Sequence, residues 1–98
     1  MSIKIPKKVS IGGIVFKIRF TKFDSDDYGQ MDFDQRLISI NHAIKNNPPI
    51  LEETLRHEML HAALAVGGVS FAVDYAEEVI VRCLESIFFP AWEKLIKK

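Results

Sequence analysis

The sequence predicts an α+β fold: a small antiparallel sheet of two hairpins, followed by two packed helices. Residues 9–41 hold short apolar runs that alternate with polar residues and are separated by glycine and other turn formers. Residues 49–90 instead place apolar side chains at helical spacing. We expect one domain, 1–98, because the 98 residues contain no linker, internal repeat or low-complexity tract.

The first half of the chain is predicted to form the two hairpins. The glycine pair at 12–13 separates two apolar runs, and such a two-residue turn needs positive φ. In the strand after it, Phe16, Ile18 and Phe20 alternate with polar residues, which indicates a half-buried strand. The stretch GQMDFDQRLISIN, residues 29–41, has the pattern of a second hairpin with its turn at DQR.

The second half is predicted to form the two helices. Asn47 is a candidate N-cap, and the first helix is expected from about Pro49 to about Val66, where a glycine pair follows. The second helix is expected to begin near Asp74 and to end near Pro90. The apolar stripes of the two helices are Leu51, Leu55, Ala62 and Val66 in the first, and Ile80, Leu84, Ile87 and Phe88 in the second.

The composition limits the classes of function. Thirteen basic residues balance thirteen acidic residues, so we expect no nucleic-acid partner, which would favour a basic excess. No apolar stretch reaches membrane-spanning length. The single cysteine, Cys83, excludes an intramolecular disulfide and is expected to be a small buried residue of the second helix. These features predict a cytoplasmic protein, and its oligomeric state stays open.

The stretch His57-Glu58-Met59-Leu60-His61 has the H-E-x-x-H pattern. Residues four apart lie on the same face of a helix, so His57 and His61 can reach one tetrahedral Zn²⁺ ion. Glu58 lies beside the first histidine, where its carboxylate can take a proton from a metal-activated water. The pattern therefore predicts zinc ligands at both histidines and a catalytic base at Glu58. The competing interpretation is an amphipathic helix that contains two histidines by chance.

A third ligand has to come from another part of the chain, and the second helix offers three glutamates. Helical phase favours Glu77, because it shares the apolar stripe of that helix. Glu78 groups with Val81 and Glu85 on a face expected to meet solvent, and it remains the alternative third ligand. Glu77 also has another explanation, a capping box with Asp74.

Three side chains are candidates for contacting the substrate or the oxyanion of a transition state. They are Tyr28, His42 and Tyr75. His42 follows the strand at residues 37–41, which is expected at the edge of the sheet. The other interpretation of His42 is a solvent-exposed loop residue. The other interpretation of Tyr75 is a residue that serves packing alone.

TLRHEMLHA followed by EEVIVRCLESIF resembles the small phage-encoded zinc metallopeptidases related to the ImmA/IrrE group, within the gluzincin-type H-E-x-x-H…E pattern. The upstream stretch YGQMDFDQRLISIN adds to this likeness, since members commonly show a tyrosine-glycine turn, a hairpin and a strand before the zinc helix. The resemblance covers about residues 28–90. The H-E-x-x-H stretch is its specific part.

The resemblance implies a minimal zincin-like fold and a phage or prophage zinc metallopeptidase, a hydrolase. It implies zinc ligands at His57, His61 and either Glu77 or Glu78, with the base at Glu58. It also implies a peptide or protein substrate added as a strand beside residues 37–41. The alternative is a catalytically silent zinc-binding module with a regulatory or interaction role. We expect no separate substrate domain, which leaves little of the chain to shape a specificity pocket.

Overall fold

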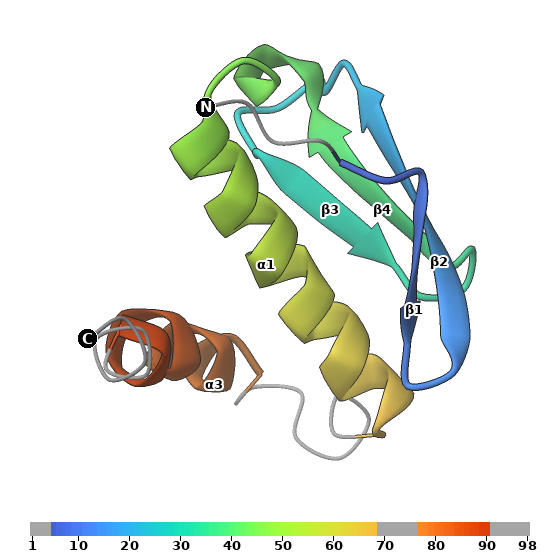
Figure 1. The fold of residues 1–98 in the computed structure, drawn as a ribbon, viewed down its shortest axis with the longest axis vertical. Coiled ribbons are helices and arrows are strands. Elements are labelled where there is room, and N and C mark those ends of the chain that lie inside the picture. The colour runs from blue at the N-terminus through green and yellow to red at the C-terminus, as the bar shows by residue number, and fades with distance from the viewer. Residues whose placement is uncertain (1–4, 69–76, 91–98) are drawn as a thin grey trace.

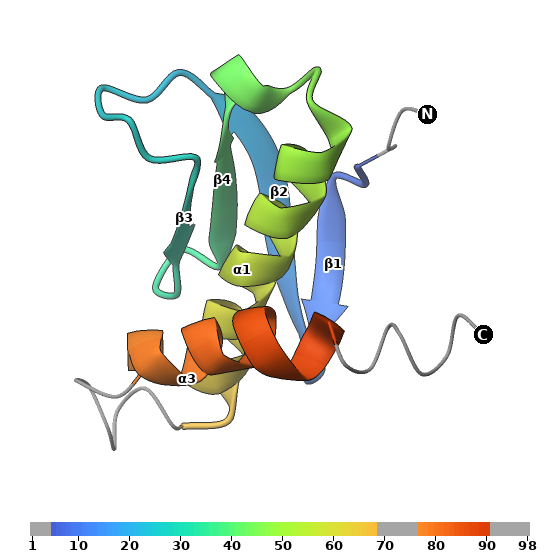
Figure 2. The same ribbon diagram turned by 90° about the vertical axis from the view of Figure 1, so that its left-hand side faces the viewer.

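The computed structural model describes residues 5–68 and 77–90 and has an α+β fold, with a four-stranded sheet and two helices (Figure 1). The elements are β1 (Lys8–Ile11), β2 (Ile14–Thr21), β3 (Gly29–Asp32), β4 (Leu37–Asn41), the 3₁₀ turn η1 (His42–Ile44), α1 (Pro48–Val66), α3 (Glu77–Cys83) and the π-helical turn η3 (Leu84–Phe88). Helix α1 lies against one face of the sheet, and α3 crosses α1 (Figure 2).

Both predicted hairpins are present. Gly12 and Gly13 take φ values of 58° and 85° between the antiparallel strands β1 and β2. In the second hairpin β3 pairs with β4, also antiparallel. Its turn is held by the carboxylate of Asp32, which accepts a hydrogen bond of 3.1 Å from the backbone N–H of Gln35. Arg36 completes this turn with a φ of 51°.

The sheet as a whole is mixed, which corrects the expected antiparallel sheet. Its strand order is β1-β2-β4-β3, and β2 pairs with β4 in parallel. Strand β4 is the only one of the four described strands with three consecutive buried residues, Ile38, Ser39 and Ile40. Consecutive residues point to opposite faces, so β4 is buried on both faces, as expected of a strand inside a sheet; the chain passes to the far edge first and returns through β4.

Residues 37–41 are therefore not an edge strand, and the expectation that a peptide adds beside them is wrong. They form β4, which has a neighbour on each side. The edge strand is β3, whose sequence GQMD is more polar. Within residues 5–68 and 77–90, no strand pairs with the outer edge of β3, which lies beside α1 (Figure 1).

The core lies between the sheet and α1. Phe16, Ile38 and Ile40 are fully buried, and they form one apolar cluster with Leu51 and Ala62 of α1. This confirms the predicted alternation in the strands and the predicted stripe in the first helix. The boundaries of that helix are also confirmed, since α1 runs from Pro48 to Val66 after its N-cap at Asn47. Burial of this stripe stabilises α1 more than helix propensity does.

Helix α3 is rotated relative to the expected phase. Val81 was placed on a solvent face but is fully buried, and Glu85 beyond it is only partly exposed. Cys83 was expected to be buried and is exposed. Ile80 and Leu84 are half-buried, as their stripe predicts. The expected start near Asp74 lies outside the described residues, as do the side chains of Ile87 and Phe88. None of the helices described here has the length and apolar character needed to cross a membrane.

Candidate metal centre

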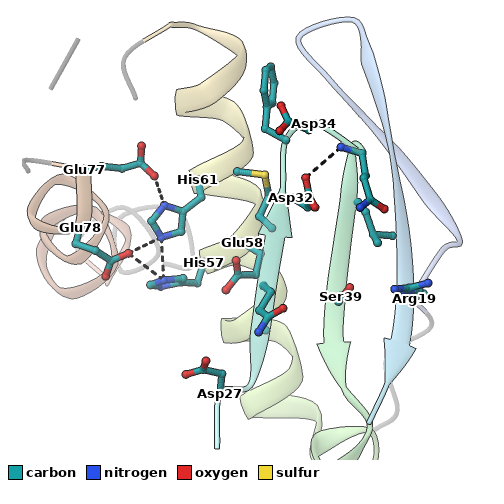
Figure 3. Close-up of a pocket in the computed structure, with 16 residues that line it drawn as sticks. Arg19, Asp27, Asp32, Asp34, Ser39, His57, Glu58, His61, Glu77 and Glu78 are labelled. Atoms are coloured by element: carbon teal, nitrogen blue, oxygen red, sulfur yellow. Dashed lines mark hydrogen bonds and ion pairs between the residues drawn. The ribbon is translucent and has the colours of Figure 1, made fainter. Parts of the chain in front are cut away.

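The two histidines of the H-E-x-x-H stretch lie one turn apart on α1 and point toward α3 (Figure 3). His57 Nε2 and His61 Nε2 are 3.2 Å apart. A tetrahedral ion with metal–nitrogen bonds of about 2.0–2.1 Å holds two nitrogens about 3.3 Å apart. The spacing of the two ring nitrogens therefore fits shared coordination of one ion.

Helix α3 brings a carboxylate to the same point. Glu78 Oε1 lies 2.5 Å from His61 Nε2 and 3.6 Å from His57 Nε2. The three ligand atoms of His57, His61 and Glu78 all lie within 4.8 Å of one another. These three residues are close enough to hold a metal ion. The structure thus groups Glu78, the alternative third ligand, with the two histidines.

Two further glutamates of the α3–η3 segment contact the other nitrogen of each imidazole ring. Glu85 Oε1 is 2.8 Å from His57 Nδ1, and Glu77 Oε2 is hydrogen-bonded to His61 Nδ1. An ionised carboxylate can only accept, so each Nδ1–H donates; in the neutral imidazole, each Nε2 then keeps its lone pair for a cation. Two lone pairs that face each other at 3.2 Å repel unless a cation lies between them.

The predicted base, Glu58, is buried between α1 and the edge strand β3, with only 8% of its surface exposed. A Cβ atom at Gly29 of β3 would lie 3.0 Å from Glu58 Cγ and 3.2 Å from Glu58 Oε2. The Glu58 side chain therefore fits against β3 because residue 29 has no side chain. Sequence reasoning gave Gly29 no such role, because the contact joins residues far apart in the chain.

The pKa values of Glu58 and His61 are both raised, but by different causes. Burial raises the pKa of Glu58; His57 and His61 oppose this shift, while the charges of Glu78 and Glu85 add to it. Burial lowers the pKa of His61, but its hydrogen bond to Glu77 and the charges of nearby carboxylates outweigh burial, so the net shift is upward. The carboxylates thus stabilise positive charge at the histidine pair, whether a proton or a metal cation.

A cleft of about 810 Å³ opens beside this group. Its walls include His57, Glu58 and His61 on one side and the edge strand β3 on the other (Figure 3). Acidic side chains dominate the charged groups that line it, and among the described residues Arg19 is the single arginine or lysine in its lining. The outer edge of β3, unpaired among the described residues, thus shares one cleft with a buried carboxylate and the histidine pair.

Of the three side chains predicted to contact the substrate, Tyr28 alone is described close to the histidine pair. Tyr28 is half exposed and lines a second cavity of about 320 Å³ together with His57, Glu58 and Glu85. His42 is exposed at the start of η1 and lines a different cavity, near Phe20 and Asn41, so the structure does not bring it to the histidine pair. Tyr75 lies outside the described residues.

Glu85 has a role at the site that the sequence does not predict. Glu85 was weighed as a possible ligand but assigned to a solvent face, whereas it contacts His57. The helical phase already groups Glu85 with Glu78, seven residues earlier and close to two helical turns away, but it predicts that this face meets solvent. The departures from the expected phase are Val81 and Glu85, which pack toward α1, and Cys83, which is exposed.

No protein-family model, curated protein or solved structure matches this chain. The likeness to ImmA/IrrE-type peptidases and to the zincin fold accordingly stays a prediction from the sequence. The interpretation of the site depends on its own geometry.

Proposed function

We propose that this chain is a zinc-dependent peptidase with His57, His61 and Glu78 as zinc ligands and Glu58 as the catalytic base. The observation that supports it most is the pair of Nε2 atoms 3.2 Å apart, with Glu78 Oε1 beside them. This choice of Glu78 replaces the expected Glu77, because Glu77 contacts Nδ1 of His61 and not the shared Nε2 side.

The donor set suits zinc in its chemistry as well as in its spacing. Two neutral imidazole nitrogens and one carboxylate oxygen are typical of a catalytic zinc site, in which a fourth position stays open. When bound, zinc lowers the pKa of a coordinated water and polarises a carbonyl oxygen. A purely structural site more often closes the fourth position with a protein ligand, and the exposed Cys83 is not in the group of ligands.

Glu58 is proposed to accept a proton from the attacking water and to deliver it to the leaving amine. A general base works best when its pKa lies close to the operating pH, and burial raises the pKa of Glu58 in that direction. Its position against β3 also places it between the histidine pair and the free strand edge. These two properties support a role in acid–base chemistry.

The substrate is proposed to be a peptide or a protein segment that adds as an extended strand to the edge of β3. Strand addition uses backbone hydrogen bonds for affinity, so a small domain can bind a peptide without a separate substrate domain. Tyr28, directly before β3, is the candidate for a contact with the developing oxyanion. We propose action in the cytoplasm, that of the host if the gene belongs to a phage, because the chain cannot form an intramolecular disulfide.

The test is to measure bound zinc and to screen a peptide library with the wild type and with Glu58→Gln. We expect one zinc per chain in both proteins and cleavage by the wild type only, because the variant keeps the ligands and lacks the base. A wild type that cleaves nothing above the variant would favour the catalytically silent zinc-binding module. A wild type without stoichiometric zinc would exclude both interpretations.

A further inference from the structure

Each histidine proposed as a zinc ligand on α1 is contacted at its Nδ1 atom by a carboxylate, and both carboxylates belong to the α3–η3 segment. Glu85 of η3 accepts from His57 Nδ1 at 2.8 Å, and Glu77 of α3 accepts from His61 Nδ1. The side chains of Glu85 and Glu77 are 22% and 18% exposed. Those of His57 and His61, which they contact, are 29% and 15% exposed. Hydrogen bonds between partly buried charged groups are stronger than those at the surface.

We propose that Glu85 and Glu77 are positioning residues that orient His57 and His61 for the metal. This inference rests on the proposed zinc site and adds two residues to it. An imidazole can rotate about its Cβ–Cγ bond and can carry its proton on either nitrogen. A carboxylate at Nδ1 restricts both choices, because it fixes the ring orientation and leaves the Nε2 lone pair for a metal.

The arrangement of the three glutamates supports a division of roles. Glu78 Oε1 lies on the Nε2 side of both rings, whereas Glu77 and Glu85 lie on the Nδ1 sides. One glutamate therefore has ligand geometry, and each of the other two serves one histidine. All three belong to one continuous helical segment, so docking of that segment orients both rings and supplies the ligand together.

The π-helical turn η3 contributes to the position of Glu85. Residues Leu84–Phe88 have π-helical geometry, and the N–H of Phe89 donates to the carbonyl of Leu84, five residues earlier. Arg56 of α1 lies with its guanidinium 5.2 Å from the ring centre of Phe89, which ties the end of this turn to the helix that carries the histidines. Turns of this kind occur frequently at functional sites.

The test measures zinc affinity by competition with a chromophoric chelator. Glu85→Ala and Glu77→Ala should each weaken zinc binding about 10–100-fold, the effect typical of losing such a partner. Glu85→Gln should lose less, because its amide oxygen can still accept from Nδ1–H. In the zinc-loaded protein, nitrogen-15 NMR should show Nδ1 protonated in both histidines of the wild type, and a loss of that single pattern in the alanine variants.

Glu53→Ala is the matched control, since Glu53 is exposed and lines the cavity next to His57 and Glu85, and no hydrogen bond to either histidine is found among the described residues. It removes the same charge nearby and should change zinc affinity less than twofold. Circular dichroism checks that each variant folds, and Glu85→Gln replaces Glu85→Ala if the latter does not.

The inference is overturned if the glutamate variants bind zinc as tightly as Glu53→Ala does, or if Glu85→Gln loses as much affinity as Glu85→Ala. If the wild type binds zinc, either of these results contradicts only the positioning roles and not the proposed function. Failure of the wild type to bind zinc instead contradicts the proposed function itself, so the two failures are distinguishable.

Discussion

At the scale of single residues, the contact between Gly29 and Glu58 connects the edge strand to the proposed base. Residue 29 has no special φ, so its need for glycine comes from space alone. An added Cβ would lie 2.8 Å from Thr54 Cγ2 and 3.0 Å from Glu58 Cγ. Such distances force neighbouring side chains to move, and Glu58 is one of the two that would move.

Gly29→Ala should destabilise the protein by about 1–3 kcal/mol, the usual cost of overpacking a close contact. It should also lower the proposed peptidase activity more than zinc affinity, because it displaces Glu58 and leaves both histidines in place. Urea unfolding measures the first effect, and activity beside zinc competition measures the second.

Gly67→Ala serves as the comparison for this change. Gly67 has a φ of −77°, and the nearest atom to an added Cβ is the carbonyl oxygen of Ala63, at 3.4 Å. An alanine fits there without strain, so we expect stability within about 0.5 kcal/mol of the wild type. Equal effects of the two substitutions would contradict the steric argument for Gly29.

Glu58→Gln should stabilise the chelated protein at neutral pH. Glu58 ionises near 4.5 in the unfolded chain and at a higher pH in the folded chain, because burial disfavours the carboxylate. As pH rises through 4.5, the unfolded state ionises first, and the folded state loses relative stability until Glu58 is ionised in both states. Glutamine carries no charge and avoids this loss.

Urea unfolding of both proteins in EDTA, at pH values from 4 to 8, checks this prediction. The stability advantage of Glu58→Gln should be smallest at the acidic end and should grow until it levels off. Other titrating groups are common to the two proteins and largely cancel in the difference. A wild type at least as stable as the variant at neutral pH would contradict the destabilising burial of Glu58.

At the scale of elements, the α3–η3 segment has a face that gathers negative charge. Glu77, Glu78 and Glu85 lie on that face with the fully buried Val81 between them. The buried Glu58 adds a fourth carboxylate nearby. Repulsion among these groups opposes docking of α3 on α1, and positive charge at the histidine pair offsets it.

Zinc should therefore stabilise the docked position of α3. Hydrogen exchange of backbone amides in residues 77–88 should slow on adding zinc, while exchange in the four strands should change little. Binding to the folded state alone also raises Tm with zinc concentration. Glu78→Ala should lose most of this protection. Equal slowing across the sheet and α3 would contradict a local effect, since it would mean that zinc acts on global stability alone.

At the scale of the whole molecule, the parallel pairing of β2 and β4 decides where the site can form. Because β4 takes the centre of the sheet, β3 becomes the edge strand and lies beside α1. An antiparallel sheet in simple chain order would have placed residues 37–41 at the edge. The cleft beside the histidine pair then would have had a different, more apolar wall.

Much of the fold was predictable, and the reasons are local. The hairpin turns follow from positive φ at Gly12 and Gly13 and from the side chain of Asp32. The bounds of α1 follow from Asn47 and the glycine pair after Val66. Such signals act within a few residues of one another, so a sequence displays them directly. The order of strands in the sheet depends on pairing between distant segments, and no local signal specifies it.

The α+β class, the two hairpins, α1 and the position of His57, Glu58 and His61 on one helix follow from the sequence alone, because they depend on backbone periodicity and turn chemistry. Three features needed the folded chain: β3 is the edge strand, Gly29 makes room for Glu58, and Glu78 joins the histidines while Glu77 and Glu85 contact their Nδ1 atoms. A small rotation of α3 about its axis exchanges neighbouring glutamates, and packing against α1, with Val81 buried, sets that rotation.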